Sequence, residues 1–166
     1  CLFANGSLTP TNTLNLTGSL NHSDVYVIAH ASANADILAL SDTTASVTFF
    51  NGNDALGLYK LGTTETLIDV IGTIGIDPGT INWPVAGIAS ATAEHTLIRK
   101  PSVTQGNLDW ATSAGTNADD SEWVVYPQNY IDNLGMHTFG NVVITPVFNP
   151  PAGAYASPIN VTISTT

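Results

Sequence analysis

The chain has 166 residues, of which 13 are acidic and 3 basic, and its formal net charge is −10. Phosphate backbones and anionic membrane surfaces are bound by clustered Lys and Arg, so this charge excludes nucleic acid and electrostatic membrane docking from the expected partners. Charged residues make up only 10% of the chain and hydrophobic residues 43%, which favours an ordinary core under a hydroxyl-rich surface, as in extracellular β proteins.

The first part of the chain predicts short strands separated by turns. Residues 32–40 are the one helical candidate, because Ala35, Leu38 and Ala39 have helical spacing and Asn34 or Ser32 is a suitable N-cap. The predicted strands are residues 2–4, which end at an Asn-Gly turn, residues 13–17, which alternate polar and apolar side chains, and residues 25–29, a continuous apolar run typical of a central strand.

The middle of the chain predicts a hairpin in which residues 47–50 and 55–59 flank the turn Asn51-Gly-Asn-Asp54. A turn over residues 61–65 follows. Residues 106–122 contain Asn, Ser, Thr, Asp and Gly with few apolar side chains, so a long loop is expected there. Further strands are predicted over residues 67–72, 94–99 and 123–126.

The composition changes after Gly140, where prolines become frequent and residues 159–164 alternate cleanly. We therefore expect a β domain over residues 1–140 and a linker with a partial β module over residues 141–166. The second part is too short for an independent core.

Several motifs occur in an order that resembles one family. They are TLNLTGSL at 13–20, DVYVIA at 24–29, FNGNDAL at 50–56, LIDVIGTIGIDPG at 67–79, TLIRK at 96–100, EW at 122–123 and LGMH at 134–137. Together they resemble the lamin-tail domain found in long secreted proteins of bacteria. The segment after Asn141, which ends in VTISTT, resembles the opening hairpin of a chitobiase C-terminal-like module.

The resemblance implies an all-β, immunoglobulin-like sandwich with one short helix and a β-rich C-terminal extension. Family members start with two more strands before the position of Leu2, so the chain resembles a segment of a longer surface protein. A sandwich without those strands has open edges that invite pairing. We expect a preceding segment or a neighbouring chain to supply them by β-strand addition.

Candidate chemical sites are few. The histidines, His22, His30, His95 and His137, show no metal-ligand spacing, and no Gly-x-Ser-x-Gly motif or triad order is present. Asp119, Asp120 and Glu122 are candidate calcium ligands, as are Asn51, Asn53 and Asp54, because calcium prefers hard oxygen donors. The alternative for both groups is turn chemistry and solvated charge. No other cofactor is expected.

The three tryptophans, Trp83, Trp110 and Trp123, have two interpretations, a platform that stacks on sugars or ordinary core packing. Thr43 is a candidate O-glycosylation site, because Asp42-Thr43-Thr44 resembles the acidic, hydroxyl, small-residue motif of some bacteria. Asn5, Asn15, Asn21 and Asn160 lie in Asn-x-Ser/Thr sequons, which a bacterial source would leave unmodified.

The single cysteine, Cys1, excludes an intrachain disulfide. It is either a lipidated N-terminus or a residue inside a strand at a cut, and the family alignment favours the second. The sequence has no apolar run long enough to cross a bilayer, so the chain is not expected to be transmembrane.

These observations predict a non-catalytic extracellular or cell-surface module for adhesion or assembly. It would act through strand-edge and loop contacts with neighbouring domains or identical chains. The alternative is a carbohydrate-binding accessory module of a secreted enzyme, with glycans as partners. A third interpretation is an enzyme fragment whose active site lies in other sequence.

Overall fold

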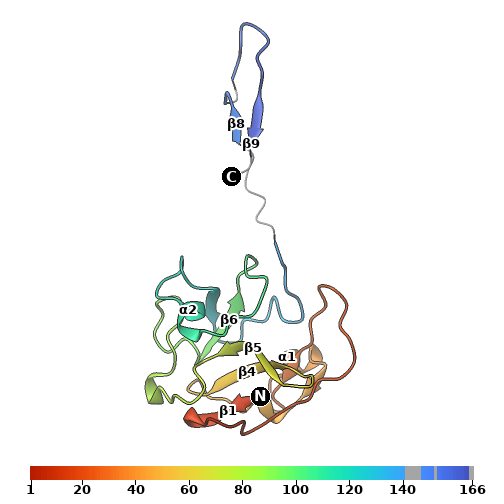
Figure 1. Cartoon of the computed structure of the whole chain (residues 1–166), viewed down its shortest axis with the longest axis vertical. Coiled ribbons are helices and arrows are strands. Elements are labelled where there is room, and N and C mark those ends of the chain that lie inside the picture. The colour runs from red at the N-terminus through yellow and green to blue at the C-terminus, as the bar shows by residue number, and fades with distance from the viewer. Residues whose placement is uncertain (141–146, 152, 165–166) are drawn as a thin grey trace.

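The computed structural model describes residues 1–140, 147–151 and 153–164. These residues form mainly short strands with few short helices, so the predicted β-rich fold is confirmed (Figure 1). The strands are β1 (Leu2–Phe3), β2 (Ile28–Ala29), β3 (Thr43–Thr44), β4 (Ala55–Lys60), β5 (Thr66–Ile71), β6 (His95–Arg99), β7 (Trp123–Pro127), β8 (Val147–Asn149) and β9 (Thr162–Ser164). The α-helices are α1 (Ala35–Ala39) and α2 (Trp110–Ala114), and the 3-10 turns are η1 (Ala4–Gly6), η2 (Ser46–Thr48) and η3 (Gly79–Ile81).

The largest sheet has the antiparallel order β1-β4-β5. Strand β4 pairs with β5 through the predicted turn at residues 61–65, and Leu56 lies opposite Ile71. The predicted hairpin between residues 47–50 and 55–59 is wrong, because residues 46–48 form η2 instead. The buried Asp54 carboxylate explains the difference: it accepts hydrogen bonds from the N–H groups of Asn5 (2.8 Å) and Asn51 (3.2 Å), which holds the Asn-Gly loop beside η1.

Two smaller sheets complete the main body. Strands β2 and β3 are parallel, and β6 and β7 are antiparallel. The predicted strand at 25–29 is shortened to β2, while those at 67–72, 94–99 and 123–126 are confirmed as β5, β6 and β7 within one or two residues. Residues 13–17 form no strand: the ladder there is a single bridge between Leu2 and Asn12, and the polar side chains that follow are exposed.

The two α-helices are each about one turn long, whereas one helix was predicted. Helix α1 confirms the prediction, and Asn34 caps it by accepting the Ile37 N–H. Helix α2 lies inside the predicted loop at 106–122, which corrects that prediction. It forms because Asp109 caps it from one end and Trp110 and Ala114 bury themselves in the core.

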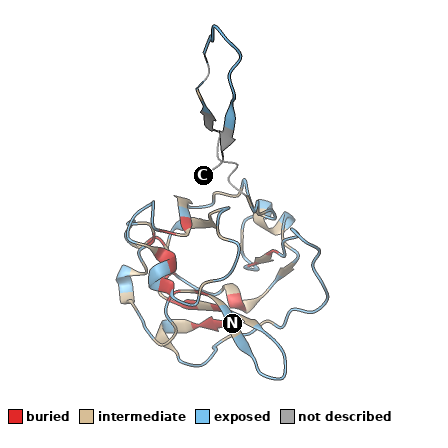
Figure 2. Ribbon diagram, turned by 45° about the horizontal axis from the view of Figure 1, so that its top comes forward, coloured by how far each residue is buried: buried red, intermediate tan, exposed pale blue. Residues whose placement is uncertain are grey.

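The main core lies between β5, β7, α2 and the loop that follows Trp83. Its buried members are Val70, Val85, Ala91, Trp110, Ala114 and Trp123. Figure 2 shows buried segments on α2 and on the strands of the β1-β4-β5 sheet. A second set of buried residues, Val27, Ala29 and Val47, holds β2 and η2 in place.

The C-terminal strands β8 and β9 form an antiparallel hairpin in which Phe148 lies opposite Ile163. The last part of the alternating run 159–164 forms β9, and residues 141–145 lie outside the described residues. No helix in the described ranges is both long and apolar enough to cross a membrane.

Candidate peptide-binding groove

A groove with a volume of about 340 Å³ lies between two strand edges of different sheets. One side is the segment 25–28, which leads into β2, and the other is residues 96–99 of β6; Tyr130 and residues 133–137 close it. Side chains alternate across a strand, so the presence of four consecutive residues of β6 in the lining indicates that the edge of β6 borders the groove. Of residues 25–28 only Ile28 belongs to a strand, and the hydrogen bonds of this segment decide which of its sides is open.

The β6 edge is open on the groove side. The Lys100 N–H donates to the Glu122 C=O (2.8 Å). In an antiparallel ladder every second residue directs its main-chain groups to the partner strand, so this bond shows which residues of β6 bond to β7. The main-chain groups of Thr96 and Ile98 then point to β7, and those of Leu97 and Arg99 point away from it. Within the described residues the N–H and C=O of Leu97 and Arg99 have no hydrogen-bond partner.

The opposite edge is open in the same sense. The C=O of Val27 accepts from Asp42 N–H (2.9 Å), its N–H donates to the Asp42 carboxylate (2.7 Å), and the C=O of Ala29 accepts from Ala45 N–H (3.2 Å). All three bonds point to the β3 side. The main-chain groups of Tyr26 and Ile28 therefore point to the other edge, and no partner for them occurs in the part of the chain that the structure describes.

This geometry suits one extended segment. An extended segment placed in the groove would lie beside the open edge of β6 and beside segment 25–28. Four residues on each side correspond to a strand length of about 13 Å. The groove is lined by apolar side chains that include Val25, Leu97 and Met136, and no Asp or Glu lines it.

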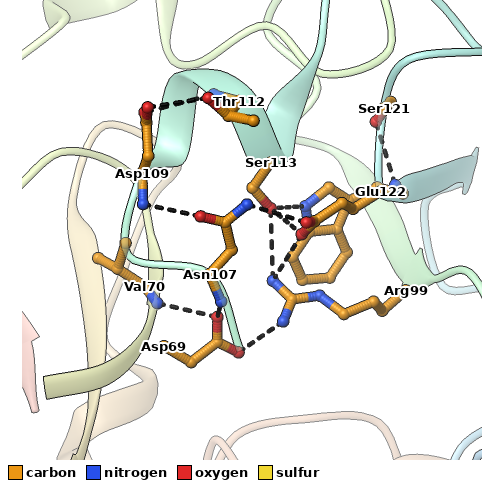
Figure 3. A network of polar contacts seen from close by, with 10 residues as sticks. Asp69, Val70, Arg99, Asn107, Asp109, Thr112, Ser113, Ser121 and Glu122 are labelled. Carbon is orange, nitrogen blue, oxygen red and sulfur yellow. Dashed lines mark hydrogen bonds and ion pairs between the residues drawn. The ribbon is translucent and has the colours of Figure 1, made fainter. Parts of the chain in front are cut away.

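A polar cluster holds β6 against the rest of the molecule (Figure 3). Arg99 donates to the Asp69 carboxylate of β5 (2.8 Å), and its guanidinium lies 3.7 Å from Glu122. It also stacks over the Trp123 ring at 4.3 Å, an arrangement that favours a cation. The Arg99 side chain is only 13% exposed, so its charge is neutralised inside the protein rather than offered to solvent.

Helix α2 contributes the second half of this polar cluster. Ser113, which is fully buried, donates to Glu122 (2.7 Å) and accepts from the Trp123 indole N–H (2.9 Å). The Asn107 side chain donates to the other Glu122 oxygen (2.8 Å), and its N–H donates to Asp69 (2.9 Å). Asp69, Glu122 and the Ser113 hydroxyl thus all have hydrogen-bond partners inside the protein, as in a cluster that stabilises the fold.

The predicted calcium ligands are placed differently from one another. Asp120 binds its own loop, accepting from the Thr116 hydroxyl (2.7 Å) and the Asn117 N–H (2.9 Å), and these bonds lower its pKa below the ordinary aspartate value. Glu122 points into the Arg99 cluster instead, and Asp119 is exposed. In the described ranges no three His, Cys, Asp or Glu side chains gather as metal ligands.

The second candidate group for calcium is also used by the fold. Asp54 accepts the two backbone bonds described above, and the Asn53 amide donates to Asn5 (3.3 Å) and Asp77 (3.0 Å). These bonds match the turn chemistry that was the alternative interpretation.

The remaining predicted residues do not line the groove. Thr43 is half-buried in β3, opposite Ile28. Trp110 and Trp123 are 4% and 7% exposed, so core packing is confirmed for both, and neither face is free to stack on a sugar. Trp83 is partly buried and packs against the same core.

Comparison of the chain with protein-family models, with curated proteins and with solved structures found no match. The lamin-tail resemblance therefore stays a prediction. Sequence reasoning named neither the groove nor its residues. The available signal was the apolar run at 25–29, which indicated a central strand, whereas the structure pairs only one of its edges.

Proposed function

We propose that this chain is a non-catalytic extracellular module of a larger secreted or cell-surface protein, and that it assembles with other β segments through the groove. The observation that carries the proposal is the pair of open backbone edges, at 25–28 and at β6, that border one groove. Soluble proteins usually protect such edges, because unpaired N–H and C=O groups recruit strands from other chains. Extended peptides bind by the same main-chain pairing.

The proposal includes the immunoglobulin-like sandwich of the lamin-tail kind. The order β3-β2, groove, β6-β7 supports it, because one added strand would turn two short ladders into a sheet beside β1-β4-β5. A role in assembly is further supported by the exposed apolar side chains at the groove, where Tyr26 is 40% and Met136 59% exposed. The Arg99 cluster supports a non-catalytic role, since its buried serine is inaccessible to a substrate.

The test is peptide selection on the complete 166-residue chain with random ten-residue peptides displayed on phage. We expect uncharged peptides with alternating apolar residues to be enriched. Met136→Glu, which places a charge in the groove, should weaken their binding at least tenfold. Leu108→Glu is the matched control, because Leu108 is also 59% exposed but does not line the groove.

Selected peptides that bind the Met136→Glu and Leu108→Glu variants equally well would contradict the proposal. The carbohydrate-binding alternative is tested in parallel by sedimentation with insoluble chitin or cellulose. Retention of the wild-type chain on either polysaccharide, with no peptide enrichment, would replace the proposed function by that alternative.

A further inference from the structure

The β8–β9 hairpin has the properties of a strand donor. Within the described residues β8 and β9 pair only with each other, so each has a second, unpaired edge. An isolated two-stranded hairpin is at best marginally stable in water, and joining a sheet stabilises it. Its apolar side chains are exposed: Ile159 is 39%, Tyr155 45% and Val161 52% exposed.

The hairpin and the groove also match in charge. Residues 133–166 contain no Asp, Glu, Lys or Arg, although the whole chain carries a net charge of −10. Most faces of two copies therefore repel each other, because acidic surfaces meet. The groove has no acidic lining residue, so an uncharged hairpin can approach it without this repulsion.

We propose that the groove binds the edge of β9, with residues 159–163, from a second copy of this chain. This inference rests on the proposed function and names the partner of the same groove. The sequence Ile159-Asn-Val-Thr-Ile163 alternates apolar and polar residues, as a strand that lies over one apolar face requires. Because β8 occupies one edge of β9, only the free edge would pair, with the main chain of Leu97 and Arg99 on the open edge of β6.

The hairpin of the same chain is the competing occupant, and the experiment below distinguishes it from a second copy. The main body ends where the Gly140 N–H donates to the Pro101 C=O (3.2 Å), directly after residues 133–137, which form a wall of the groove.

Groove and hairpin are different surfaces, so the contact is heterologous. Each copy can donate its hairpin to one neighbour and accept a hairpin from another. Heterologous contacts of this kind produce open chains of copies unless the rotation closes a ring.

The test is a complementation experiment with full-length variants, followed by light scattering after size exclusion and by analytical ultracentrifugation. The wild-type mass should rise from one copy to several as concentration increases. Met136→Glu, in the groove, and Val161→Lys, on the hairpin, should each remain a single copy at the same concentrations. An equimolar mixture of the two should form a two-copy complex and nothing larger, because only one intact groove and one intact hairpin meet.

Two control variants test whether a charge placed outside the groove and outside β9 also changes the association. Leu108→Glu adds the same charge outside the groove, and Ala154→Lys adds a cation to the exposed hairpin loop away from β9. Both should associate as the wild type does. Circular dichroism of all variants checks that each is folded.

A wild-type chain that stays a single copy at every concentration would overturn the inference. If selected peptides still bound its groove, the proposed function would stand without this partner. If Val161→Lys then increased peptide affinity, the occupant would be the hairpin of the same chain. Loss of both self-association and peptide binding would remove the proposed function as well.

Discussion

At the scale of single residues, Arg99 connects the open edge of β6 to the rest of the molecule. Its backbone lies on the open edge of β6, while its guanidinium contacts Asp69, Glu122 and Trp123. A buried ion pair adds little over an apolar pair, but breaking it leaves uncompensated charge. Arg99 therefore fixes the position of β6 relative to β5.

We predict that Arg99→Met lowers the free energy of unfolding by about 2–4 kcal/mol, because Asp69 and Glu122 lose their cation in a partly buried site. Urea denaturation followed by tryptophan fluorescence measures this. Lys60→Met is the control: Lys60 is exposed at the end of β4, and its change should stay within about 0.5 kcal/mol. Equal effects of the two substitutions would show that the Arg99 cluster is not a support.

Gly115 ends α2 with a backbone conformation that excludes other residues. Its φ of 65° and ψ of 175° fall in a region that is essentially restricted to glycine, and an added Cβ would lie 2.6 Å from Ser121 backbone atoms.

We predict that Gly115→Ala destabilises the protein by about 2–4 kcal/mol, because neither the strained backbone nor the clash can relax cheaply. The urea midpoint of Gly62→Ala, where the nearest atom is 3.7 Å away, should match that of the wild type. A wild-type midpoint for both variants would contradict the described end of α2.

At the scale of elements, α2 and the loop after it depend on two exposed aspartates. Asp109 caps α2, and the Thr112 hydroxyl bond, followed by the Thr112 N–H bond, lowers its pKa below the ordinary aspartate value. Bonds from the Thr116 hydroxyl and the Asn117 N–H act in the same direction on the pKa of Asp120. A carboxylate whose pKa is lowered by folding stabilises the folded state above its unfolded pKa.

The predicted pH dependence follows from this sign. The stabilisation from Asp109 and Asp120 is complete above the unfolded aspartate pKa and is lost as the pH falls through their lower folded pKa values, below about pH 4. The urea midpoint should fall less between pH 6 and pH 3 in the Asp109→Asn, Asp120→Asn double variant than in the wild type. Glu65→Gln, an exposed side chain in the β4–β5 turn, should retain the wild-type drop; an unchanged drop in the double variant would refute the assignment.

Local patterns in the sequence predict those elements whose signal lies within a few residues. The runs that became β5, β6 and β7 contain β-branched and aromatic residues, and Asn34 marks the start of α1. Helix α2 is missed because a single turn has no periodicity and because its stability comes from the burial of Trp110. The groove is also missed, since it depends on which of two distant segments, 25–28 and β6, find partners.

At the scale of the whole molecule, the central feature is a set of small sheets with unpaired edges. The main body has a core under β5, β7 and α2, while β2 and β6 face each other across the groove. The uncharged hairpin provides a strand of the kind that the groove lacks. The proposed assembly therefore follows from edges that a single copy leaves unpaired.

The central claim is that the β6 edge is open in the single copy, and amide hydrogen exchange followed by NMR on the dilute chain tests it most directly. The N–H groups of Thr96 and Ile98 point to β7 and should exchange slowly. Those of Leu97 and Arg99 should exchange much faster, at least tenfold, and become protected when copies associate at high concentration. Equal protection of all four amides in the dilute chain would mean that the edge is already paired, and it would contradict the account.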